Sequence, residues 1–118
     1  MAYNESNISV SLNAAADLTA AQYKFVSIDS NGAIALTGDG EHADGVLMSA
    51  PNTGEAGTVT ISGIAKVECG GEVTAGGDVA SDANGAAGNA GSGDAVLGTA
   101  LETGASGRVI SILFHPRG

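Results

Sequence analysis

The sequence predicts an all-β fold: a small compact β-barrel or sandwich of about eight to ten short strands. Short segments rich in Val, Ile and Thr alternate with turns, and 19 of the 118 residues are Gly. Asn31-Gly32 stands between two such segments, and a second Asn-Gly pair, Asn84-Gly85, follows the segment at 78–81. Asn-Gly is a strong hairpin signal because a type I′ turn needs positive φ at both central residues. Residues 26–62 also resemble residues 79–112, so two similar repeats are expected to build the domain.

The first predicted strand covers residues 7–12, where polar and apolar residues alternate as on a half-buried strand. Residues 1–16 are interpreted as an extended N-terminal arm that contains this strand and an Ala-rich link. Its apolar row, Ile8, Val10 and Leu12, is expected to contact a neighbouring subunit or a capsid surface by adding a strand to it. Pairing within its own chain is the alternative.

Residues 17–118 are predicted to form a single β domain. It opens with a short helical turn capped by Asp17. Gly63 is expected to end one strand before another begins, and residues 86–93, made of Ala, Gly, Asn and Ser, are interpreted as a flexible loop. Strands are predicted near residues 23–28, 33–37, 45–49, 57–62, 64–68, 78–81, 95–101 and 107–114.

The two repeats align with a change of offset. Val26 matches Val79, 53 positions later, whereas Asp44 matches Asp94, 50 positions later. The alignment therefore predicts that the second repeat has lost three residues between these points. The repeated residues are of types that set backbone shape, so the repeat describes a scaffold and not a reaction centre.

Composition narrows the function classes. The formal net charge is −9, with only four Lys and Arg, which argues against nucleic acid or an anionic membrane as a partner. Aromatic residues make up 3% of the chain and Trp is absent, so the core is thin and oligomerisation is expected to support it. One Cys cannot form an internal disulfide, and the N-terminus lacks the features of a signal peptide, which predicts synthesis in a reducing cytoplasm.

Candidate chemical sites are few. His42 lies in a Gly-rich loop with three carboxylates, but the spacing matches no zinc or calcium pattern, and a solvated acidic loop is the simpler interpretation. His115 is expected at the surface near the chain end. Asp29 and Asp82 begin Asp-x-Asn-Gly turns, where capping of backbone amides explains them better than calcium ligation. Cys69 is expected to be a small buried residue and not a nucleophile. No catalytic residue, metal site or cofactor is predicted.

Several motifs in order carry a resemblance to a known family. They are Asp17-Leu-Thr-Ala-x-Gln-Tyr-Lys-Phe-Val26, Asp44-Gly-Val-Leu47, Ile61-Ser-Gly-Ile-Ala-Lys-Val67, Val73-x-Ala-Gly-Gly-Asp-x-Val79 and Val96-Leu-Gly-x-Ala-Leu101. In order and spacing they resemble the small capsid decoration, or cement, proteins of tailed phages. The resemblance implies a structural virion protein, commonly a homotrimer, that binds the outside of an icosahedral head and clamps adjacent major capsid protein subunits. It implies no enzymatic activity and no cofactor.

Two other classes remain as alternatives. A carbohydrate-binding or fibre-associated β module would fit the strand pattern, although the chain has few aromatics for stacking on sugars. A lipoyl- or biotinyl-carrier domain is also built from two similar β halves, but needs a Lys at a hairpin tip. Here Lys24 and Lys66 both lie in strand-like segments.

Overall fold

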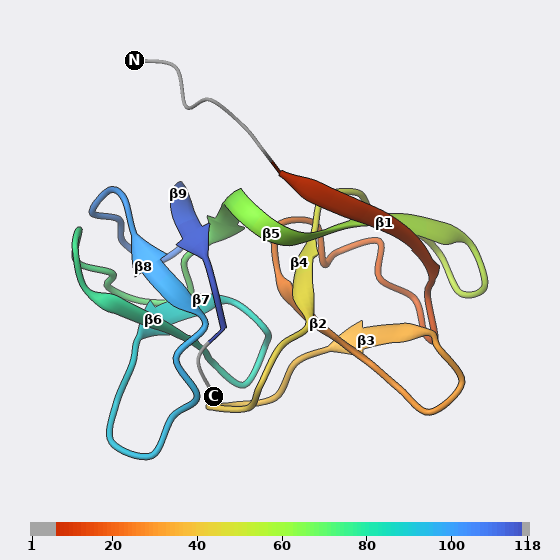
Figure 1. The fold of residues 1–118 in the computed structure, drawn as a ribbon, viewed down its shortest axis with the longest axis horizontal. Coiled ribbons are helices and arrows are strands. Elements are labelled where there is room, and N and C mark those ends of the chain that lie inside the picture. Colours follow the sequence, from red (N-terminus) through yellow and green to blue (C-terminus); the bar gives the residue numbers. More distant parts are fainter. Residues whose placement is uncertain (1–6, 117–118) are drawn as a thin grey trace.

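A computed structural model describes residues 7–116. All regular elements within this range are strands, which confirms the predicted all-β fold (Figure 1). There are nine of them among the described residues: β1 Ile8–Asn13, β2 Phe25–Ile28, β3 Ile34–Leu36, β4 Gly45–Leu47, β5 Ala56–Glu68, β6 Asp78–Ser81, β7 Ala87–Asn89, β8 Gly98–Ala100 and β9 Val109–Phe114.

The strands form one curled antiparallel sheet in the order β3-β2-β4-β5-β9-β8-β6-β7, with β1 paired to β5. Figure 1 shows two lobes side by side, with β1 to β4 in one and β6 to β9 in the other. In each lobe an isolated parallel bridge joins the far ends of the curl, Ala14 to Ile34 and Cys69 to Ala87. Each lobe is therefore a small, nearly closed barrel, which leaves few free strand edges.

β5 belongs to both lobes, and this corrects the prediction that Gly63 separates two strands. The strand runs through Gly63, which has a φ of 107°. Residues before Gly63 pair with β1 and β4, and Gly63 and the residues after it pair with β9. Because glycine reaches positive φ without a Cβ clash, Gly63 lets one strand change direction and enter the second barrel.

The lobes are two copies of one ladder. In the first, Val26 pairs with Leu36 and Val46 pairs with Thr60; in the second, residues 53 positions later make the same pairs, Val79 with Asn89 and Thr99 with Leu113. The offset of 53 therefore holds for every pair that β2, β3 and β4 make. The predicted loss of three residues in the second repeat is wrong, because matching Asp-x-Val-Leu letters placed the alignment out of register.

β1 is also part of the repeat. Leu12 of β1 pairs with Gly57, and Val67 in the second part of β5 pairs with Ile110. β1 thus has the same place in the first lobe as residues 64–68 have in the second, 55 positions later. The boundary predicted at residue 16 consequently falls inside the first repeat, and residues 1–6 of the predicted arm lie outside the described range. We call residues 8–62 the first half and residues 63–114 the second half.

Residues 86–93 are not the predicted flexible loop. Ala87–Asn89 form β7, which pairs with β6 across the Asn84-Gly85 turn as β3 pairs with β2 across Asn31-Gly32. The composition gave no sign of this strand. The strand pairs with β6 through its backbone, and of its three residues only Ala87 is fully buried. Strands therefore pair across both Asn-Gly turns. The expected type I′ geometry is wrong, because Gly32 and Gly85 have positive φ whereas Asn31 and Asn84 do not.

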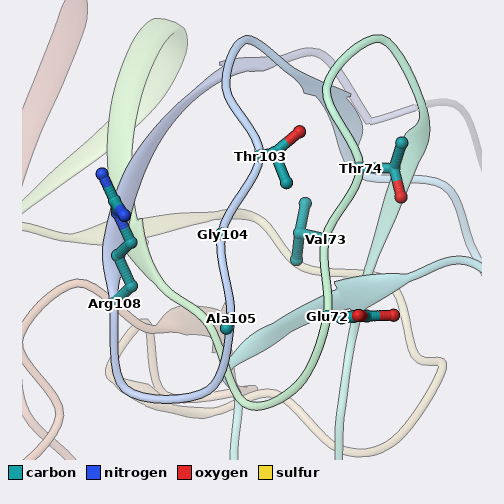
Figure 2. A pocket seen from close by; sticks show the side chains of 7 residues that line it. All are labelled: Glu72, Val73, Thr74, Thr103, Gly104, Ala105 and Arg108. Atoms are coloured by element: carbon teal, nitrogen blue, oxygen red, sulfur yellow. The ribbon is translucent and has the colours of Figure 1, made fainter.

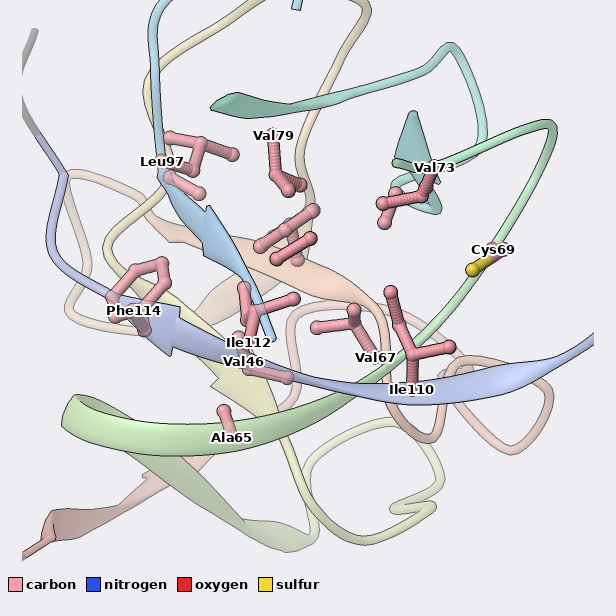
Figure 3. Packing of buried hydrophobic residues seen from close by; sticks show 14 residues of the cluster. Val46, Ala65, Val67, Cys69, Val73, Val79, Leu97, Ile110, Ile112 and Phe114 are labelled. Carbon is pink, nitrogen blue, oxygen red and sulfur yellow. The ribbon is translucent and has the colours of Figure 1, made fainter. Parts of the chain in front are cut away.

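Two hydrophobic cores hold the molecule together, one per half. The core of the first half includes Leu18, Val26, Ile34, Leu47 and Val59. The larger core of the second half also contains Phe25, Ala43 and Val46, which come from the first half (Figure 3). β2 and β4 therefore bury both faces: Val26 and Leu47 point into their own barrel, whereas Phe25 and Val46 point into the other.

Candidate functional site

The predicted contact row lies on an exposed strand of the first half. Ile8 is 54% exposed, and Val10 and Leu12 are half-buried at the edge of the first core. β1 pairs with β5 of its own chain, which is the alternative that the sequence left open. Its hydrogen bonding to β5 leaves the opposite edge of Ile8–Asn13 without a strand neighbour among the described residues. Contact of this row with a capsid or a neighbouring subunit stays a prediction.

The first barrel is open at one end where the second is covered. Val10, Leu12 and Ile61 are half-buried, whereas their counterparts Ala65, Val67 and Phe114 have at most 2% of their surface exposed. Ile28 is 44% exposed, against 3% for its counterpart Ser81. We call Val10, Leu12 and Ile61, which pack against the first core, together with the exposed Ile28 of β2 the first-half socket. Sequence reasoning missed Ile28 and Ile61, although an alignment with a constant offset of 53 would have matched Ile61 with Phe114.

The Asp residues of the Asn-Gly turns serve the backbone. The Asp29 carboxylate accepts hydrogen bonds from the amides of Asn31 (2.9 Å) and Ala33 (3.0 Å). Asp82 accepts the same pair from Asn84 (2.8 Å) and Ala86 (3.0 Å). The turn interpretation of both motifs is thus confirmed, because one carboxylate oxygen satisfies two amides of each loop.

The acidic loop around His42 is tied to the backbone in the same manner. Glu41 accepts a hydrogen bond from the Gly38 amide at 3.2 Å, and Asp44 accepts one from the Ile28 amide at 2.8 Å. The His42 Nε2 lies 3.5 Å from the second Asp44 oxygen at the exposed surface. Over residues 7–116, no group of three or more His, Cys, Asp and Glu side chains is arranged to hold a metal ion.

Cys69, His115 and Asp17 lie in ordinary structural environments. Cys69 is buried at the end of β5, where loss of solvation raises the pKa of its thiol, so the reactive thiolate is disfavoured. His115 is half-buried, with its Nε2 3.1 Å from the Thr99 hydroxyl. At the predicted cap, hydrogen bonds from the hydroxyl and amide of Thr19 lower the pKa of Asp17, but the turn they stabilise does not continue into a helix.

A shallow pocket of about 320 Å³ lies in the second half, between two of its loops (Figure 2). Its walls are the segments 72–74 and 103–105 together with Arg108. The two segments are hydrogen-bonded to each other through the backbones of Val73 and Gly104. In Figure 2 the Arg108 and Glu72 side chains lie on opposite sides and do not converge, so the pocket presents no constellation for catalysis.

The described residues contain no helix that is long and apolar enough to cross a bilayer.

The geometry defines a class of protein: a duplicated all-β scaffold that exposes several apolar side chains among polar and charged ones. No protein-family model and no curated protein matches the sequence. Among solved structures, the chain is similar to the head fiber gp8.5 N base in bacteriophage phi29, with a TM-score of 0.76 and 16% sequence identity. The likeness covers 92% of this chain and 94% of that one. At this identity, the likeness establishes a shared fold.

Proposed function

We propose that the chain is a structural, non-enzymatic protein of a tailed-phage virion that binds the outside of the head. The observation that carries this proposal is the fold shared with a phage head fiber base over nearly the full length of both chains. The acidic charge favours an outer location, since contact with packaged DNA calls for cations. The role needs no cofactor, nucleic acid or membrane, and the protein would be made in the host bacterial cytoplasm.

In this proposal the protein cements adjacent major capsid protein subunits and so stabilises the expanded capsid. Ile8, Val10 and Leu12 supply an apolar row beside a β1 edge that no other described strand pairs with, and a capsid strand can pair with such an edge. Many copies around a shell make individually weak contacts effective through multivalency. Self-association as a homotrimer adds to this effect and supports a thin core.

Co-sedimentation with heads assembled from the cognate major capsid protein tests the proposal. We expect the protein to pellet with heads, to raise the temperature at which heads release DNA, and to show the mass of three chains in light scattering. Failure to pellet at micromolar concentration, with the free protein folded, would contradict head binding. A monomer that still pellets would contradict trimerisation in solution alone.

A fibre-associated role is the second candidate, because the similar solved structure is itself the base of a head fiber. Such a base would anchor a projecting part to the shell without linking subunits. Electron cryo-microscopy of decorated heads separates the two roles. Density that bridges neighbouring capsid subunits supports cementing, whereas density confined to one site beneath a projection supports the fibre base.

A further inference from the structure

At the interface between the halves, side chains of the first half enter the core of the second, and residues 7–116 show no matching contact on the first-half core. Phe25 and Val46, paired across β2 and β4, project from the first half into the second-half core. The Phe25 ring stacks on Phe114 with 6.2 Å between ring centroids. Ala65 and Val67 belong to the same cluster, and Figure 3 shows Val46 beside Ile112 and Val67. The second barrel therefore has a socket that an aromatic and a β-branched side chain fill.

Backbone groups around that socket are satisfied from the first half as well. The Phe25 amide donates to the Gly85 carbonyl at 2.7 Å, and the Gly40 amide donates to the Ser81 carbonyl at 2.9 Å. In the first half, the corresponding carbonyls belong to Gly32 and Ile28. Both residues are exposed, so the first-half socket lacks the cover that completes the second-half one.

A second copy of the chain does not provide the matching cover. The ladder places Asp78 where the first half has Phe25, and Thr99 where it has Val46. Asp78 is exposed, and its carboxylate would have to enter an apolar socket if one copy stacked on another in the same geometry. Polar outer faces of this kind end a stack of repeats.

We propose that the first-half socket docks uncharged apolar side chains presented by a strand pair of another protein, in the position that Phe25 and Val46 occupy on the second half. The four side chains of the socket are aliphatic, and the Asp44 carboxylate lies at its rim, where it accepts a hydrogen bond from the Ile28 amide at 2.8 Å. The contact within the chain provides the template for the occupant. On the basis of the proposed function, this partner is the major capsid protein. Ile28 is exposed, whereas its counterpart in the second half, Ser81, is buried. Ile28 therefore adds apolar surface at the rim that such a partner covers.

The chain itself can be made to supply the missing cover. The double variant Asp78→Phe and Thr99→Val restores on the second half the pair that the first half presents. We expect its mass in sedimentation velocity to rise with concentration above that of the wild type, as the restored pair of one molecule docks in the first-half socket of the next. A folded double variant with the wild-type mass at every concentration would overturn the proposal.

Adding Ile28→Asp to the double variant provides the control for non-specific stickiness. This variant replaces the apolar Ile28 side chain with a carboxylate beside that of Asp44, and the mass is expected to return to that of the wild type. Continued association of this triple variant would show that the introduced aromatic ring adheres elsewhere, and would overturn the proposal too.

Head binding by single variants gives an independent test should the double variant fail to fold. Ile28→Asp is expected to weaken co-sedimentation with heads about tenfold or more. Leu113→Asp, at a residue similarly exposed (41%) on the second half, should leave binding unchanged. Equal binding by Ile28→Asp and wild type would overturn the docking site. Absence of binding by the wild type would instead refute the proposed function, while the self-association test of the socket would still stand.

Discussion

The two halves share one backbone ladder but differ in what covers them. Phe114 at the end of β9 is buried beneath Phe25, whereas its counterpart Ile61 is half-exposed. Gly32, in the turn between β2 and β3, is exposed, whereas Gly85, in the matching turn between β6 and β7, is buried. Backbone pairing therefore defines both barrels, while the side chains decide which barrel is covered by its own chain and which is less covered.

Substitution at the two matched core positions, Phe114 and Ile61, should give the largest difference in stability loss between the halves. Phe114→Ala removes a buried ring from the core that joins them and is expected to lower the free energy of unfolding by about 3–5 kcal/mol. Ile61→Ala removes a half-exposed side chain and should cost about 1–2 kcal/mol. Urea denaturation measures both, and equal losses would show that the halves are covered alike.

Substitution of the two matched turn glycines distinguishes the cost of backbone strain from the cost of a steric clash with neighbouring atoms. Gly32 and Gly85 have φ values of 78° and 76°, so Ala at either position costs about 1–3 kcal/mol in strain. A Cβ on Gly32 meets nothing within 4 Å, whereas one on Gly85 would lie 2.9 Å from Leu36 Cδ2 and 3.1 Å from the Phe25 carbonyl oxygen. We expect Gly85→Ala to cost about 1–3 kcal/mol more than Gly32→Ala.

Thermal denaturation of the two variants is a sufficient measurement. A larger loss of stability for Gly32→Ala would contradict the placement of the Gly85 turn against the first half. Gly32→Val and Gly85→Val are expected to destabilise further, because β-branched residues disfavour positive φ.

Substitution of the turn carboxylates should change the free energy of unfolding least, and by nearly the same amount in the two halves. Asp29→Ala and Asp82→Ala each remove two hydrogen bonds of matched length, and each should cost about 1–2 kcal/mol. Addition of calcium should leave the melting temperature of the wild type unchanged. A marked calcium-dependent rise that either variant abolishes would restore the metal interpretation.

Much of this fold could be predicted from the sequence because its signals are local. The alternation in β1 and the Asn-Gly turns indicated strands and hairpins without any knowledge of packing. β7 was missed because Ala, Gly and Asn carry no strand signal, and its place depends on pairing with β6. The continuity of β5 was missed because a Gly inside a strand usually weakens it, and only the second barrel explains the bend.

The candidate site was predicted less fully. Ile8, Val10 and Leu12 were identified from their alternation, but the open end to which Val10 and Leu12 contribute needs Ile28 and Ile61 from β2 and β5. These residues look like ordinary strand residues in the sequence. Their exposure becomes informative only when the ladder pairs them with buried counterparts, because burial depends on the tertiary contacts of Phe25 and Val46.

Docking at the first-half socket can be tested by hydrogen–deuterium exchange of the free and head-bound protein, read by mass spectrometry. We expect head binding to slow exchange in peptides containing β1 and Ile28. Peptides from β6 and β8, on the polar outer face of the second half, should exchange as in the free protein. Protection confined to the second half, with β1 and Ile28 unchanged, would contradict docking at the first-half socket.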